Sequence, residues 1–168
     1  MEYVGYVLIL LAGSGLGLYA SHRLRRQVTM LERIERLLQR WIQELAYTAR
    51  PMKELWQSLA ASGLFDDLPL LTDTAAGLER ADFLTAFTAA VESSAARGLL
   101  TAEGRRLLLE MGQGCGRYDL AGQGEHLRRY GERLSALREE LSRQAATKGH
   151  VYRVMGPAAG AALVLLLM

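Results

Sequence analysis

Residues 24–45 read LRRQVTMLERIERLLQRWIQEL, and apolar residues recur there at steps of three and four positions. Steps of this size place side chains on one face of an α-helix. The stretch therefore predicts a long amphipathic helix, which ends before Pro51 because the residue preceding a proline avoids the helical region. Glu35 fills one step of the series. The apolar stripe consists of Leu24, Val28, Leu31, Leu38, Ile42 and Leu45.

Shorter helices are predicted after this stretch, and residues that favour helix ends bound them. Asp82 suits the position that caps a helix N-terminus, whereas Gly63 and Gly98 suit the positions at which helices stop. Pro51 can also serve as the first residue of the helix that it precedes. The predicted ranges are 51–62, 70–80, 82–97 and 101–112.

A second long helix is predicted to follow a glycine-rich turn, GQGCG, at residues 112–116. Asp119 can cap this helix. Two long amphipathic helices that pack antiparallel, with short helices over their apolar stripes, form an all-α helical bundle. The second stripe consists of Leu127, Tyr130, Leu134, Leu137 and Leu141.

Both ends of the chain are apolar. No charged residue occurs in residues 3–20 or 154–168, and every Lys and Arg lies between these two blocks. A helix of the length of the first block measures about 27 Å, close to the roughly 30 Å hydrocarbon layer of a bilayer. We therefore predict a transmembrane helix over residues 1–20, a cytoplasmic helical bundle over 21–153, and a second transmembrane helix over 154–168.

The basic residues that flank these blocks predict the orientation of the chain. They lie only on the inner side of each block, and the positive-inside rule then places residues 21–153 in the cytoplasm and both termini outside. Two alternatives remain for these blocks. A cleaved signal peptide would need its basic residues before the first block, and the second block is short enough to be a buried core helix. The flanking residues are His22, Arg23, Arg25, Arg26, Arg143, Lys148 and Arg153.

Glycines four residues apart occur in both terminal blocks. Gly13 and Gly17 form one pair, and Gly156 and Gly160 form the other. This spacing lets helix backbones approach closely in lipid, so it indicates packing between membrane helices. The alternative is that glycine is simply frequent in membrane helices.

Residues with the chemistry of an active site are sparse. The three histidines have no metal-ligand spacing, and Cys115 has no histidine near it in sequence. The glycine-rich turn lacks the Lys-Ser/Thr of a phosphate loop. The formal net charge of +2 is too small to indicate a nucleic-acid binder. We therefore expect a protein that is not an enzyme, holds no metal or cofactor, and binds no nucleic acid.

Four short motifs follow one another along nearly the whole chain. In this order and spacing they resemble the stage III sporulation protein AB family of endospore-forming bacteria. The chain departs from the family pattern at Gly104, where an acidic residue is frequent. The motifs are Glu44-Leu45-Ala46-Tyr47 with Pro51-Met52 and Leu59-Ala60, Leu99-Leu100-Thr101-x-Glu103 with Met111-Gly112, Gly116-x-x-Asp119-x-x-x-Gln123, and Tyr152-x-x-x-Gly156-x-x-x-Gly160.

The resemblance implies a subunit of the channel that joins mother cell and forespore, in the mother-cell membrane facing the forespore. Such proteins look like the inner-membrane platform protein of type II secretion and type IV pilus machines. By that analogy the cytoplasmic bundle would dock a secretion-type ATPase, and the membrane helices would meet other channel subunits in the lipid bilayer. The alternative function is a membrane-anchored helical scaffolding or signalling domain unrelated to secretion, which could act as a homo-oligomer.

The motif residues have two possible roles. Six of them are candidates for the surface that docks the ATPase. Alternatively, Tyr47 and Pro51 fix the corner between two helices, and Asp119 caps a helix with Gln123 bonded to it one turn later. The six candidates are Glu44, Tyr47, Pro51, Gly116, Asp119 and Gln123.

Overall fold

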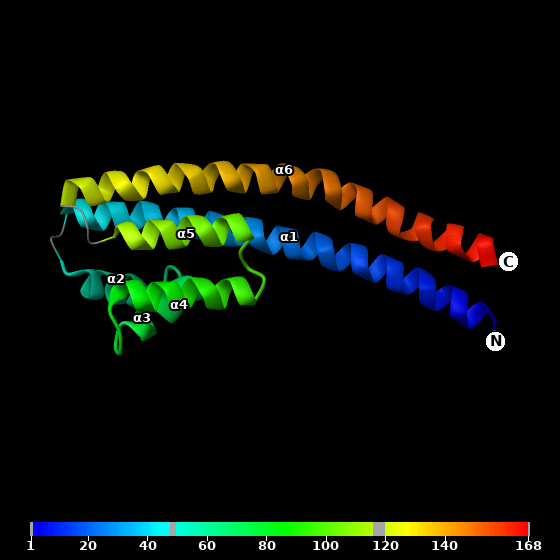
Figure 1. Ribbon diagram of the computed structural model, residues 1–168, viewed down its shortest axis with the longest axis horizontal. Coiled ribbons are helices and arrows are strands. Elements are labelled where there is room, and N and C mark those ends of the chain that lie inside the picture. Colours follow the sequence, from blue (N-terminus) through cyan, green and yellow to red (C-terminus); the bar gives the residue numbers. More distant parts are fainter. Residues whose placement is uncertain (1, 48–49, 116–119, 168) are drawn as a thin grey trace. The chain divides into compact units, whose positions relative to one another are not determined.

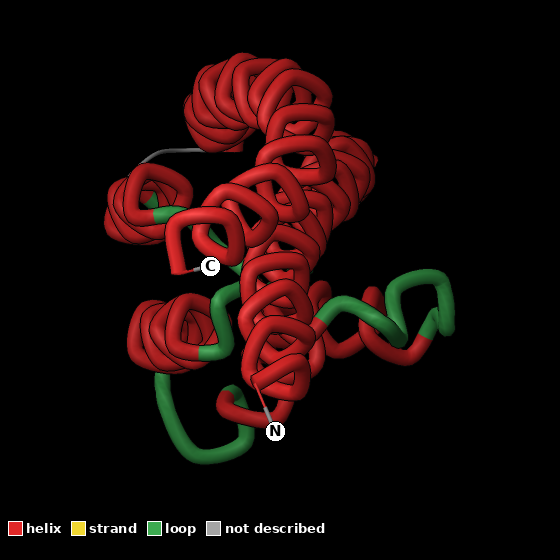
Figure 2. Tube along the Cα trace, turned by 90° about the vertical axis from the view of Figure 1, so that its right-hand side faces the viewer, coloured by secondary structure: helices red, strands yellow, loops and turns green. Residues whose placement is uncertain are grey.

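The protein is all-helical in the residues that its structure, a computed structural model, describes. These are residues 2–47, 50–115 and 120–167, with side chains described for Tyr19 and for 21–47, 50–115 and 122–147. Helices and loops account for all of them, with no strand in these ranges (Figure 2), so the predicted fold class is confirmed at this level. The helices are α1 (Glu2–Tyr47), α2 (Met52–Ala61), α3 (Pro69–Gly77), α4 (Phe83–Ala96), α5 (Ala102–Gly114) and α6 (Leu120–Leu167).

The chain divides into two compact units. The central unit is Thr29–Arg138, and the terminal unit combines Met1–Val28 with Glu139–Met168. The central unit is shorter than the cytoplasmic domain predicted over residues 21–153. The helices α1 and α6 each continue without a break into the terminal unit.

The two predicted transmembrane segments lie mostly outside the described side chains. Among the residues whose side chains are described, no helix is both long and apolar enough to cross a bilayer. For residues 2–20 and 154–167 the structure describes the backbone, and Tyr19 is the one residue of these ranges whose side chain is also described. The two membrane spans therefore stay a prediction.

The ends of the short helices follow local chemistry. Thr101 caps α5, because its Oγ1 accepts a hydrogen bond of 3.1 Å from the Gly104 amide. Gly63 and Gly98 follow α2 and α4 with φ of 71° and 73°, a conformation that glycine adopts without steric cost. The predicted ranges of the short helices are confirmed to within three residues at each end.

Inside the central unit, α1 and α6 lie side by side and antiparallel, with α5 against them and α2, α3 and α4 beyond (Figure 1). Glu35 of α1 and Arg138 of α6 are joined at 2.8 Å. Helix α3 packs on α4, and α4 packs on α5. The predicted cover of short helices over two long ones is therefore present in this unit.

An aromatic cluster joins α1, α2 and α4. The rings of Trp41 and Trp56 meet edge to face with centroids 5.0 Å apart. Phe83 and Phe87 stack at 5.4 Å, and Phe87 also meets Trp56 at 5.7 Å. Both tryptophans are fully buried. Large buried rings contribute most of the apolar area removed from water in a small core, so this cluster anchors α2 and α4 to α1.

Candidate functional site

The candidate residues lie at one end of the central unit, where α1 ends, α2 begins, α5 ends and α6 begins (Figure 1). We call this region the motif end. It contains Glu44, Tyr47, Pro51 and Gln123 among the described residues. Gly116 and Asp119, also predicted there, lie outside the described residues.

Tyr47 is the most exposed large apolar side chain described, at 88%. It is the last residue of α1. Glu44 lies one turn earlier and is half-buried, with its Oε1 2.9 Å from Arg40 Nη2. The exposed ring beside a charged pair makes this part of the motif end accessible to a partner.

Pro51 occupies the position just before α2, not its first residue as predicted. Its φ of −56° and ψ of 144° are extended, and its carbonyl accepts a hydrogen bond of 3.1 Å from the Leu55 amide. Proline cannot donate a backbone hydrogen bond, and at a helix start no donor is needed. The contribution of Pro51 that these contacts support is to set the corner between α1 and α2.

Gln123 is buried, at 6% exposed, in the first turn of α6. Its Nε2 has no hydrogen-bond partner in the described part of the chain. The predicted bond between Gln123 and Asp119 involves a residue outside that part. Burial favours a role for Gln123 within the fold over direct contact with a partner.

The end of α5 is held by contacts that the sequence did not reveal. The Met111 carbonyl oxygen lies 3.0 Å from His126 Nε2 of α6 and accepts a bond of 3.3 Å from Cys115 Sγ. Because a carbonyl only accepts, the first contact requires Nε2 to carry the proton. A Cβ on Gly114 would lie 2.2 Å from His126 Cε1, so only glycine leaves room for the ring.

Helix α5 ends at Gly114, within the segment 112–116 that was predicted to break the helical pattern. Gly112 serves packing. A Cβ there would lie 2.7 Å from Phe87 Cδ1, so the glycine lets α5 approach the aromatic cluster closely.

Burial raises the pKa of the half-buried Cys115 thiol to about 12. At pH 8 such a thiol is almost fully protonated, whereas an exposed cysteine of pKa about 8.5 is roughly a quarter thiolate. We expect iodoacetamide to label native Cys115 at least about tenfold more slowly than the urea-unfolded chain at pH 8. Mass spectrometry at timed intervals measures both rates, and equal rates would contradict the burial of the thiol.

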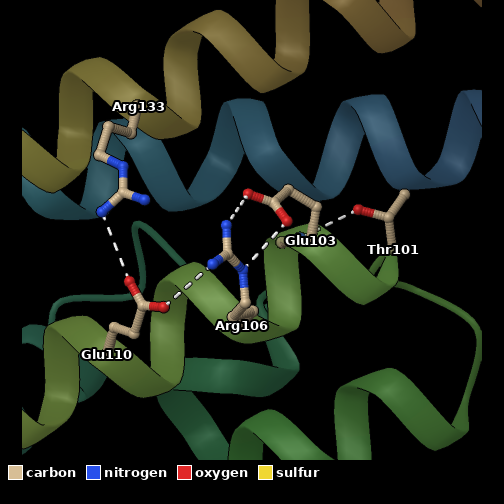
Figure 3. Close-up of polar contacts among 6 residues, drawn as sticks. Thr101, Glu103, Arg106, Glu110 and Arg133 are labelled. Carbon is tan, nitrogen blue, oxygen red and sulfur yellow. Dashed lines mark hydrogen bonds and ion pairs between the residues drawn. The ribbon is translucent and has the colours of Figure 1, made fainter.

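A chain of charged contacts joins α5 to α6 (Figure 3). Arg106 pairs with Glu103 at 2.6 Å and with Glu110 at 3.4 Å, and Arg133 of α6 reaches Glu110 at 3.4 Å. The hydrogen bond from Arg106 lowers the pKa of Glu103. The four side chains are exposed or half-exposed, so each pair contributes little to stability.

A groove of about 220 Å³ runs between α1 and α6 of the central unit. Leu38 and Ile42 supply apolar surface, Arg128 and Glu132 supply charge, and Gly131 leaves one wall open. Next to the groove, hydrogen bonds from Arg128 and Arg129 lower the pKa of Glu125 to about 2, so this carboxylate stays ionised at neutral pH.

None of these arrangements brings catalytic groups together. Within the described residues, no group of three His, Cys, Asp or Glu side chains is placed to hold a metal ion. The contacts at the motif end are packing contacts, helix ends and ion pairs.

The four glycines predicted to pack membrane helices lie in the terminal unit. Gly13 and Gly17 belong to α1, and Gly156 and Gly160 belong to α6. The surroundings of all four fall outside the described side chains. Packing between these positions stays a prediction.

Comparison with known proteins identifies one family. A family model described as stage III sporulation protein AB matches residues 2–168. Neither a curated protein nor a solved structure matches the chain. The match includes both apolar ends and all four motifs quoted above.

Proposed function

The chain belongs to the stage III sporulation protein AB family and is a sporulation protein, and from this premise we propose that it is a non-catalytic membrane platform subunit of the channel between mother cell and forespore. In this role its central unit docks a cytoplasmic secretion-type ATPase. The two apolar ends anchor it in the mother-cell membrane beside other channel subunits. Residues 21–153 face the cytoplasm, and both termini lie outside.

The exposure of Tyr47 carries the docking proposal. A family-motif tyrosine whose ring is 88% exposed offers that ring to another protein. Tyrosine is enriched among the residues that dominate protein–protein binding, because it combines a rigid apolar ring with a hydroxyl. The half-buried Glu44 beside it holds a charge at the edge of the same surface.

The continuity of α1 and α6 supports the anchoring proposal. Each helix runs from an apolar, uncharged block into the amphipathic stretch of the bundle. Basic residues follow the first block and precede the second, as expected for a domain on the cytoplasmic side. A force applied by an ATPase at the bundle would then reach the membrane along two uninterrupted helices.

We expect Tyr47→Ala to weaken binding of the full-length chain to the cognate secretion-type ATPase by at least about tenfold, the loss typical of an aromatic side chain central to an interface. Leu64→Ala is the matched control, because Leu64 is also apolar and 68% exposed on the central unit. The control should change the Kd by less than about twofold. Surface plasmon resonance with the detergent-solubilised chain measures all three affinities.

Two outcomes of that experiment count against the proposal. No binding by the wild-type chain would remove the ATPase as its partner and favour a scaffolding role. Equal weakening by both variants would show that general apolar exposure, not the motif end, governs the contact. Circular dichroism of each variant checks that the helices are retained.

A further inference from the structure

One face of α1 carries an aromatic and basic stripe just beyond the first apolar block. Tyr19, His22, Arg23 and Arg26 are spaced by three and four residues and are all exposed, and Tyr19 is 69% exposed. This spacing puts the four side chains on one side of the helix. Arg25 beside them is exposed as well.

Arg23, Arg25 and Arg26 differ from most arginines of the central unit, because they have no acidic partner among the described residues. In the central unit, Arg33 lies 2.6 Å from Asp67, and Arg97 lies 2.9 Å from Asp73. No ion pair of Arg23, Arg25 or Arg26 occurs among the described residues. The sequence holds no Asp or Glu from residue 3 to residue 31. Within the described residues, the positive charge here is therefore not offset by an ion pair.

We propose that Arg23, Arg25 and Arg26 form a cationic collar that binds the phosphate groups of anionic phospholipids. The inference rests on the proposed membrane anchoring. An arginine guanidinium matches a phosphate in a bidentate geometry, and a run of arginines next to a membrane helix attracts anionic headgroups. The ligand is the lipid headgroup at the cytoplasmic surface of the bilayer.

The position of Tyr19 independently supports a bilayer surface as the ligand. Tyrosine concentrates at the boundary between hydrocarbon and headgroups, where its ring is apolar and its hydroxyl is wet. Arg23 lies one helical turn, about 6 Å, beyond Tyr19. The headgroup layer is about 5–7 Å thick on each side of the hydrocarbon. With Tyr19 at the boundary, Arg23 falls at the depth of the phosphates. Arg25 and Arg26 start about 9 and 10.5 Å beyond Tyr19, and their long side chains can reach back to the same layer.

Lipid selectivity of the full-length chain in vesicles tests this proposal. The chain is reconstituted into phosphatidylcholine vesicles that contain spin-labelled phosphatidylglycerol or spin-labelled phosphatidylcholine, and electron spin resonance measures the lipid held at the protein. We expect the wild-type chain to favour the glycerol lipid by at least about threefold at low salt. The preference should fall toward about one in 1 M salt, where screening extends to about 3 Å.

Two triple variants separate charge from folding effects. Replacing the three arginines by glutamine should reduce the preference to about one, whereas replacing them by lysine should retain most of it, because the charge remains. Replacing Arg36, Arg106 and Arg129 by glutamine is the matched control, since it removes the same charge from paired positions. That control should leave the preference unchanged.

The results distinguish failure of this inference from failure of the anchoring. A wild-type chain that immobilises both lipids equally overturns the collar while leaving the membrane spans intact. A chain that immobilises neither lipid overturns the anchoring itself, and the collar with it. Loss of the preference in the control variant would assign it to net charge and would also overturn the collar.

Discussion

Replacing Trp56 by alanine is expected to lower the free energy of unfolding of the central unit by about 3–5 kcal/mol. The side chain is fully buried, and its ring meets Trp41 at 5.0 Å and Phe87 at 5.7 Å. Truncation removes these contacts and leaves a cavity that rigid neighbouring rings cannot fill. A domain of this size is stable by only about 5–15 kcal/mol, so the loss is a large share of the total.

Urea unfolding of the full-length chain, followed by circular dichroism, measures this loss as a shift of the midpoint. Leu64→Ala is the control, because an exposed apolar side chain should contribute within about 0.5 kcal/mol. Trp41 remains as a fluorescent reporter in the variant, and its environment should become wetter. A Trp56→Ala chain as stable as the control would show that the cluster does not hold α2 and α4 on α1.

The helices of this protein could be predicted from the sequence because their signals are local. Thr101 and Gly98 mark helix ends by the hydrogen bonds and backbone angles that they allow, and neither depends on distant residues. The apolar period of residues 24–45 was equally visible. The class of the fold follows from such signals alone.

The buried face of α1 was predicted too narrowly. Leu31, Leu38 and Leu45 are buried as expected, but Ile42 is only half-buried, whereas Trp41 is fully buried. A stripe with steps of three and four describes a helix with one neighbour. Here α1 contacts α6 on one side and α2 and α4 on another, so its buried face is wider. The spacing of apolar residues along one helix does not show how many other helices pack against it.

The sequence predicted which residues belong to the candidate site, but not which of them are exposed on its surface. The sequence placed Tyr47 and Gln123 in family motifs with equal weight. The structure separates them, because one is exposed and the other is buried. The exposure of each side chain depends on how four helix ends meet. His126, whose ring lies 3.0 Å from the Met111 carbonyl oxygen of α5, belongs to no motif, so the sequence did not indicate its role.

Replacing glycine by alanine in α5 and α6 is expected to give the second large effect. The same substitution should raise the free energy of unfolding at one position and lower it at another. Alanine is favoured over glycine inside a helix by about 1 kcal/mol. At Gly131 no described atom lies within 4 Å of the added Cβ, so Gly131→Ala should stabilise the chain by up to about 1 kcal/mol. At Gly112 the new methyl would lie 2.7 Å from Phe87 Cδ1.

We expect Gly112→Ala to destabilise the chain despite the gain in helix propensity, since overpacking a core costs about 1–3 kcal/mol. Phe87 cannot move aside cheaply, because it stacks on Phe83 at 5.4 Å and meets Trp56. The two alanine variants should therefore differ by about 1–3 kcal/mol in urea unfolding. A smaller residue at position 87 should reduce the cost, so Phe87→Leu and Gly112→Ala combined should lose less than the sum of the single losses. Strict additivity would show that Gly112 is not needed for the approach of α5 to the aromatic cluster.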